Sequence, residues 1–189
     1  MDTETAMTHD LSPPGAAPDP VTFRRALSRV PTSVVVVSAM HDGHPVGMLV
    51  GTFTSVSLTP LLVGYLGDRG SSTLPALLRA ETISFSVLRE TDLRTVTAFR
   101  RPREARFQDV SWERDRQFGS PVLTGAPLVV FGRPWAQTDA GDHVFVVAEV
   151  LAVRTNGPAR PLVFCGGRLT RMDPGHMVDN DIWQLGWHE

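Results

Sequence analysis

Apolar and polar residues alternate with a period of two through much of this chain, and this pattern predicts short β-strands. Turn residues separate the apolar segments: Asp42-Gly43 favours a tight hairpin, and residues 139–142 form a second turn. The strands expected from the pattern cover residues 33–40, 45–53, 61–66, 83–88, 128–137, 144–154 and 161–168.

Three segments carry helical signals instead. Residues 22–29 place Phe23 and Leu27 on one face, with Thr22 as the expected N-cap. Two further helices are expected over residues 71–80 and 91–99.

Two segments are expected to be loops. Residues 100–122 are polar and rich in arginine, which predicts an irregular, mobile loop. The segment 47–60 is expected to run from a strand into a loop rich in hydroxyl groups and to stop at Pro60.

Six or seven strands with few helices predict a mainly β fold, an antiparallel β-barrel. Strands and helices do not alternate regularly, and no Gly-x-Gly-x-x-Gly follows a strand, which excludes a Rossmann site. Residues 1–20, rich in Pro, Ala and Asp, are expected to be a disordered tail. The domain is expected to cover residues 21–169. A C-terminal extension, 170–189, holds two tryptophans, Trp183 and Trp187, that are expected to pack.

Composition excludes several classes of function. The net charge of −2 gives no electrostatic case for nucleic acid or an anionic membrane. No apolar segment approaches the ~20 residues of a membrane helix, and the N-terminus lacks a signal-peptide core, so a cytoplasmic protein is expected. All 18 basic residues are arginine, which excludes lysine Schiff-base chemistry and a P-loop lysine.

The sequence gives no evidence for a metal site or an internal disulfide. Cys165 is the single cysteine, so an internal disulfide is excluded. The six histidines show no metal-binding spacing, and we expect no metal site.

The segment from Gly47 to Pro60 is the first candidate for ligand binding. Glycines inside a strand pattern, here Gly47 and Gly51, often mark a close approach of a ligand to the backbone. The hydroxyls that follow, from Thr52 to Ser57, can bond the edge of a heterocycle. The alternative is a loop whose hydroxyls cap its own backbone.

Three other segments could carry chemistry. Ser71-Ser72-Thr73 precedes a predicted helix and could hold a phosphate, or only cap the helix. Four arginines in residues 100–106 could hold a phosphate or form a solvated loop. His143 follows Gly141-Asp142 where a turn becomes a strand; Asp142 or Glu149 could orient it, and the alternative is a structural histidine.

Together these segments resemble the flavin reductase-like family, the FMN-binding split barrel of short-chain NAD(P)H:flavin oxidoreductases. The matching pieces occur in the family's order across residues 22–169. They are Phe23–Leu27, Pro31–Val34, Gly47–Pro60, Ser71–Thr73, Arg106–Phe107, Gly119–Leu123, Gly141–His143 and Pro161–Phe164.

The resemblance implies a homodimer that transfers a hydride from NADH or NADPH to FMN, or to FAD, and supplies reduced flavin to a partner monooxygenase. Ser71–Thr73 and Arg106 would meet the flavin phosphate, and the catalytic residue His143 would lie near the nicotinamide. The flavin-binding residues implied are Thr32, Met48, Leu49, Val50, Gly51, Thr52, Phe53, Ser55, Ser57, Ser71, Ser72, Thr73, Phe99 and Arg106.

The chain departs from the family's usual pattern at a few positions. Gly51-Thr52 stands where Ser-Ser or Asn-Ser is commoner, Ser33 and Ala148 stand where glycine is usual, and Arg100 stands where a small residue is common. One alternative is therefore an enzyme on the same barrel that retains its flavin and acts directly on a small organic substrate. Another is a flavin-binding carrier.

Overall fold

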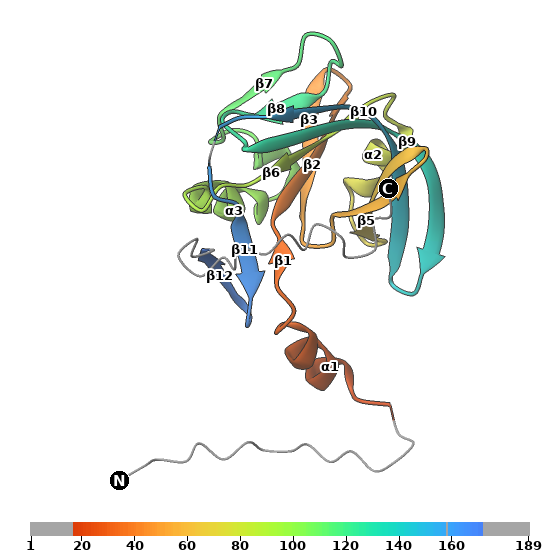
Figure 1. Ribbon diagram of the computed structural model, residues 1–189, viewed down its shortest axis with the longest axis vertical. Helices are drawn as coiled ribbons and strands as arrows, with labels where there is room; N and C mark the ends of the chain where they lie inside the picture. The colour runs from red at the N-terminus through yellow and green to blue at the C-terminus, as the bar shows by residue number, and fades with distance from the viewer. Residues whose placement is uncertain (1–16, 158, 172–189) are drawn as a thin grey trace.

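The computed structural model describes residues 17–157 and 159–171 (Figure 1). Most of the tail expected at residues 1–20, and the extension with Trp183 and Trp187, lie outside the described residues. No helix within the described ranges is both long and apolar enough to cross a membrane.

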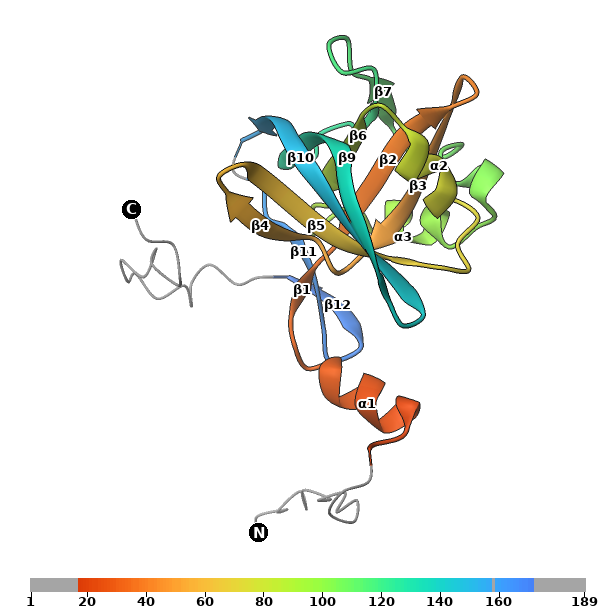
Figure 2. The same ribbon diagram turned by 90° about the vertical axis from the view of Figure 1, so that its right-hand side faces the viewer.

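A seven-stranded antiparallel sheet forms most of the fold, which confirms the mainly β class. Its strand order is β3-β2-β6-β9-β10-β5-β4, and Figures 1 and 2 show it curling round on itself. The strands are β2 (Val35–His41), β3 (His44–Val50), β4 (Thr54–Leu58), β5 (Leu61–Asp68), β6 (Ile83–Val87), β9 (Leu128–Ala140) and β10 (His143–Thr155). The expected hairpin at Asp42-Gly43 is confirmed, because both residues have positive φ and join β2 to β3.

Smaller elements flank this sheet. A three-stranded sheet has the order β1-β11-β12, and β7 pairs with β8. The bounds are β1 (Thr32–Ser33), β7 (Trp112–Arg114), β8 (Pro121–Leu123), β11 (Leu162–Cys165) and β12 (Arg168–Arg171). The helices are α1 (Pro20–Leu27), α2 (Leu74–Arg79), α3 (Leu93–Phe99) and the 3-10 turn η1 (Arg103–Ala105).

The core is divided by β2, which is buried on both faces. Val35 and Val37 point into the curl of the sheet, where they pack with Tyr65 and Phe85. Val36, on the opposite face, belongs to a second cluster with residues of α3, β8 and β9. A strand buried on both sides has an almost continuous apolar sequence, as β2 does.

Buried serines hold β8 against the large sheet. The hydroxyls of Ser38 on β2 and Ser84 on β6 both donate to the carbonyl oxygen of Pro121, the first at 3.0 Å. Ser86 accepts a hydrogen bond from the Leu123 amide at 3.2 Å. The serines that alternate with apolar residues in β6 therefore face a second layer of protein and not solvent.

Helix α1 extends from one end of the molecule (Figures 1 and 2). Its N-cap is Asp19, which accepts the amide hydrogens of Val21 and Thr22, so the expected cap at Thr22 is wrong. The C-terminal end of α1 is attached to the β11–β12 turn, because the Gly166 amide donates a hydrogen bond to the Ser28 carbonyl at 2.6 Å. The Cys165 thiol donates to the carbonyl of the next residue, Arg29, at 3.6 Å.

Two sequence expectations about loops are wrong. The hydroxyl-rich segment after Phe53 is strand β4, paired with β5, and only residues 51–53 separate it from β3. The segment 100–122 is not irregular, because it contains η1, β7 and the first part of β8. Phe107 explains its order, since this ring is 7% exposed and packs edge-on against Phe99.

Candidate functional site

The Gly-Asp-His turn lies beside the segment that leads into Ser71-Ser72-Thr73. Gly141 has a φ of 64°, which allows a two-residue turn between β9 and β10. His143 begins β10 and pairs with Asp68 at the end of β5. The Arg69 amide then donates to the Asp142 carbonyl at 3.1 Å. The backbone of the Gly-Asp-His turn is therefore joined to residues 68–69, which immediately precede the Ser71-Ser72-Thr73 segment.

Asp142, and not Glu149, orients the ring of His143. The Nδ1 atom of His143 lies 2.7 Å from Oδ1 of Asp142. This hydrogen bond, together with the charge of the imidazolium, lowers the pKa of Asp142 below its usual value. Glu149 instead pairs with Arg133 at 2.7 Å. With Nδ1 engaged, the Nε2 atom of the 40%-exposed His143 side chain is left for a ligand.

Arg106 joins β3 to the segment that begins α2. Its Nη1 donates to the Gly47 carbonyl at 2.8 Å and to the Thr73 hydroxyl at 3.1 Å. Burial lowers the pKa of Arg106; the Glu104 carboxylate opposes this shift, and the Arg103 charge adds to it. A guanidinium that has lost part of its hydration is stabilised by an anion.

A second arginine, Arg103, supports the same segment. Its Nη1 donates to the Ser72 carbonyl at 2.9 Å. The arginine-rich sequence therefore folds onto residues 72–73 and is not a free solvated loop.

The chain lacks side-chain bulk where β3 ends. Gly51 is exposed, and a Cβ built on it would lie 3.1 Å from the Thr32 hydroxyl. The neighbouring Thr52 hydroxyl accepts the Leu66 amide hydrogen at 2.9 Å and so ties this end of β3 to β5. Backbone and hydroxyl groups of Thr32, Gly51 and Thr52 thus meet at one open edge.

The remaining candidate residues divide into core and surface positions. Met48, Val50 and Phe99 have buried side chains, and Leu49 is half-buried against the second core cluster. The Phe53 ring packs at a tilt against Phe85, with a centroid distance of 4.9 Å.

The last two candidate hydroxyls lie on β4. Ser55 is exposed, and the Ser57 hydroxyl accepts the Thr59 amide hydrogen at 3.2 Å. None of the contacts described above joins these two serines to Arg106 or His143.

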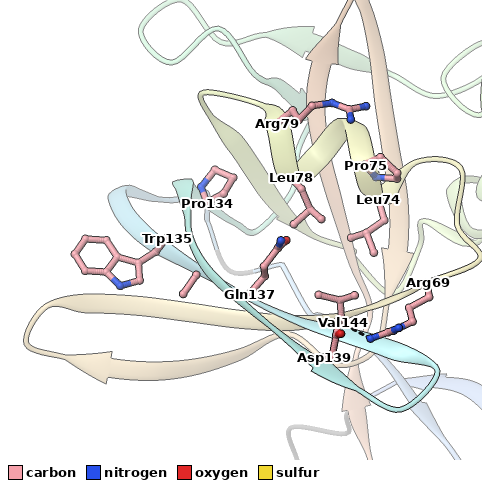
Figure 3. Close-up of a pocket in the computed structure, with 11 residues that line it drawn as sticks. Arg69, Leu74, Pro75, Leu78, Arg79, Pro134, Trp135, Gln137, Asp139 and Val144 are labelled. Carbon is pink, nitrogen blue, oxygen red and sulfur yellow. Dashed lines mark ion pairs between the residues drawn. The ribbon is translucent and has the colours of Figure 1, made fainter.

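A cavity of about 780 Å³ adjoins this site and was not expected from the sequence (Figure 3). It lies between α2 and β9, with Arg69 and Asp139 at one edge and Trp135 at the opposite edge. Pro134 lies in the middle of a long strand pattern, and proline in a sheet marks an edge or a bulge. This proline was the sequence feature that could have indicated an irregular strand here. Among the residues that the structure describes, no cluster of three metal-binding side chains occurs.

Comparison with known proteins identifies the family. The sequence profile described as "Flavin reductase like domain" matches residues 27–173. The chain belongs to the flavin reductase-like family.

Individual proteins of known name are similar to this flavin reductase-like chain. The chain is 35% identical over 153 residues to a flavin reductase of Pseudomonas putida, covering 80% of this chain and 89% of that protein. It is 39% identical over 150 residues to the FMN reductase (NADH) SmoA of Agrobacterium fabrum, covering 79% and 84%. The crystal structure of a nitrilotriacetate monooxygenase component B homologue from Mycobacterium thermoresistibile superposes with a TM-score of 0.82 at 26% identity. That match covers 89% of this chain and 94% of the other.

The positions at which this flavin reductase-like chain departs from the usual pattern lie in different surroundings. Ala148 is fully buried in the sheet's core, and Ser33 is half-buried in β1. Arg100 is the C-cap that follows α3, next to Arg101, whose carbonyl accepts a hydrogen bond from Arg106. Gly51, in contrast, lies at the open edge described above.

Proposed function

We propose that this protein is a flavin reductase that transfers a hydride from NADH to FMN. The observation that carries the proposal is the backbone bond between Arg69 and Asp142, because it ties the Gly-Asp-His turn to the residue two positions before Ser71. Arg106 joins the same segment to β3. A phosphate-binding group, an open edge and a histidine are thereby linked by a continuous series of contacts.

The chemistry of these groups suits a flavin mononucleotide. Arg106 is a partly desolvated cation next to the Thr73 hydroxyl, and such a cation favours a phosphate. Gly51 lets a flat ring approach the backbone, and the adjacent Thr32 hydroxyl can bond its polar edge, while the Thr52 hydroxyl bonds Leu66 and holds this edge in place. When bound, the flavin supplies the hydride-accepting chemistry, and the protein supplies orientation.

His143 is proposed to position the nicotinamide. Asp142 holds Nδ1, so Nε2 can donate a hydrogen bond to the nicotinamide amide or hold a proton there. Correct placement of the two reactants can lower the barrier substantially, and the proposed hydride transfer needs no strong acid or base.

The proposal names FMN and NADH because the A. fabrum relative is called an FMN reductase (NADH). A partner oxygenase is supported by the M. thermoresistibile relative, whose name describes a component of a monooxygenase. We therefore propose that reduced flavin leaves this protein for a flavin-dependent monooxygenase. The open edge at Gly51 is compatible with such an exchange.

A homodimer is proposed from apolar surface that the described residues, 17–157 and 159–171, leave exposed. Phe23 and Leu27 on α1 are 56% and 50% exposed, and α1 has no buried residue. On the large sheet, Leu58, Leu61 and Val153 are more than half exposed. Exposed apolar surface of this kind marks protein interfaces.

Loss of the NADH absorbance band in the presence of excess FMN tests the function. We expect oxidation of NADH to depend on both added flavin and protein, with slower rates for NADPH. Absence of flavin-dependent oxidation with every pairing of NADH or NADPH with FMN or FAD would contradict the proposal. A yellow protein that keeps its flavin through gel filtration without turnover would indicate the flavin-retaining alternative.

A further inference from the structure

The cavity between α2 and β9 begins where the proposed phosphate site ends. Leu74 and Pro75, which follow Thr73 directly, line it, as do Leu78 and Val144. These four residues give the cavity an apolar wall, and its volume of about 780 Å³ lies in the range of sites for small organic ligands. None of the roles proposed above uses this cavity.

Trp135 occupies an unusual position at the edge of this cavity. In the pairing of β9 with β10, Ala136 opposes Val147 and Pro134 opposes Ala148, which leaves Trp135 as the extra residue of a β-bulge. A bulge redirects a side chain and is common beside active sites. The Trp135 side chain is 54% exposed, and a flat exposed indole is a surface on which a nucleic-acid base can stack.

Polar groups line the cavity along the rest of β9. Gln137 and Asp139 lie two and four residues after Trp135, on the same face of the strand, and Asp139 is about 13 Å further along it. The Asp139 carboxylate pairs with Arg69 at 2.5 Å (Figure 3). On the opposite side, Arg79 is exposed and makes no ion pair or hydrogen bond with the described residues.

We propose that this cavity binds the adenosine diphosphate group of a dinucleotide whose ribose 2′-hydroxyl is free. Trp135 stacks on the adenine, and Asp139 accepts hydrogen bonds from the ribose hydroxyls, the role that an acidic residue often has in nucleotide sites. The guanidinium groups of Arg69 and Arg79 pair with the diphosphate. The cavity volume of about 780 Å³ exceeds what a single ring would fill and accommodates a base, a sugar and two phosphates.

The identity of the dinucleotide, NADH or FAD, rests on the flavin reductase activity proposed above. Both molecules contain this group with a free 2′-hydroxyl. NADPH carries a phosphate at that position, and the Asp139 carboxylate opposes a second negative charge there. The cavity therefore favours NADH over NADPH.

Calorimetric titration of ADP into the flavin-free protein tests the site without turnover. We expect ADP to bind, Trp135→Ala to weaken binding roughly tenfold, and Trp135→Phe, which keeps a ring, to retain most of it. Arg79→Gln should weaken binding several-fold. Arg116→Gln, which removes an exposed arginine from the β7–β8 turn, should not. Absence of ADP binding, or equal binding by the wild type and Trp135→Ala, would overturn the proposal.

Steady-state kinetics shows whether the bound adenosine diphosphate group belongs to NADH or to FAD. If the cavity serves NADH, Trp135→Ala raises KM for NADH and leaves the Kd for FMN unchanged. If it serves FAD, the same substitution removes any preference for FAD over FMN. In either case, Asp139→Asn should reduce the preference for a free 2′-hydroxyl over a 2′-phosphate. Comparing the affinities of ADP and 2′-phosphorylated ADP for the wild type and the variant measures this preference directly.

The two hypotheses can fail independently. ADP binding without any flavin-dependent NADH oxidation would end the proposed function and leave the site standing. An active reductase whose Trp135→Ala variant keeps its KM for NADH, its flavin preference and its ADP affinity would end the site alone. Altered sedimentation of that variant with unchanged ADP affinity would also overturn the inference, because it would identify a protein interface.

Discussion

The backbone amide of Arg69 donates a hydrogen bond to the carbonyl oxygen of Asp142 at 3.1 Å. This bond fixes the Gly-Asp-His turn beside the end of β5 without using either side chain. Side chains at residues 142 and 143 can therefore be changed while the backbone that places them is retained. Substitutions here report on chemistry more than on folding.

Replacing His143 should slow turnover and leave flavin binding intact. We expect His143→Asn to lower kcat/KM for NADH on the order of tenfold to a hundredfold, because a reactant that is misplaced reacts more slowly. Asp142→Asn should cause a smaller loss in the same direction, since Nδ1 of His143 keeps a weaker partner. Stopped-flow kinetics and flavin fluorescence titration measure the two properties. A loss of flavin affinity equal to the loss in kcat/KM would contradict this role.

Removing the charge of Arg106 should affect FMN more than riboflavin, which lacks the phosphate. A charge-assisted hydrogen bond contributes about 1.5–3 kcal/mol, so Arg106→Gln should raise the Kd for FMN roughly tenfold to a hundredfold. Arg94→Gln, on the exposed face of α3, is the matched control. Because Arg106 also bonds Gly47 and Thr73, thermal unfolding must be recorded alongside. Equal losses for FMN and riboflavin would show that the guanidinium does not contact the phosphate.

A methyl group at Gly51 should crowd the open edge of the site. The new Cβ would lie 3.1 Å from the Thr32 hydroxyl, a contact that forces one of the two residues to shift. Gly51→Ala is expected to weaken FMN binding several-fold, and Thr32→Ala in the same chain should restore part of that affinity. Fluorescence titration of FMN into the wild type, the two single variants and the double variant gives the coupling energy between the two positions. Additive effects would argue against a shared binding edge.

A charge on α1 should disrupt the proposed homodimer. Leu27→Asp places a carboxylate in the apolar face of the helix, and analytical ultracentrifugation should show a shift toward monomer. Leu93→Asp is the matched control, because Leu93 on α3 is 51% exposed and Leu27 is 50% exposed. If both variants sediment like the wild type, α1 does not contribute to self-association.

Acid should destabilise the protein partly through Asp115. Burial raises the pKa of this carboxyl, but hydrogen bonds from the Phe118 amide, Arg154 and the Gln117 amide outweigh burial and lower the pKa below its usual value. A lowered folded-state pKa contributes stability that is fully present above about pH 4 and is lost as the pH falls through the folded-state value.

Substituting Asp115 tests this linkage. Asp115→Asn should cost roughly 1–3 kcal/mol of unfolding free energy at pH 7, because Arg154 loses its charged partner. The difference in stability between the wild type and the variant should shrink as the pH falls from about 4, measured by urea unfolding at each pH. A difference that is constant with pH would contradict the assignment.

The sequence predicted most strands because their period of two and their turn residues are local signals. Asp42-Gly43 marks its hairpin without help from distant residues. The expectations failed where distant contacts decide the structure. Phe107 orders the arginine-rich segment by packing on Phe99, and β5 supplies the partner that makes a strand of residues 54–58. Neither contact has a signature in the nearby sequence.

The candidate site was predictable in its parts but not in its assembly. Hydroxyl, glycine and histidine motifs are visible in the chain, yet the bond from Arg106 to Gly47 joins residues 59 positions apart. Trp135 was missed because an exposed tryptophan and a core tryptophan look alike in sequence. Only the pairing of β9 with β10 shows that this residue lies in a bulge.

The thiol of Cys165 is a natural site for attaching a single spectroscopic label. It lies beside the residue where α1 joins the rest of the chain, and no other cysteine occurs in the 189 residues. One paramagnetic label can therefore be attached at this junction without any substitution. In a two-fold symmetric assembly, dipolar spectroscopy would then report a single label-to-label separation. The same label in the Leu27→Asp protein would lose that signal as the subunits part.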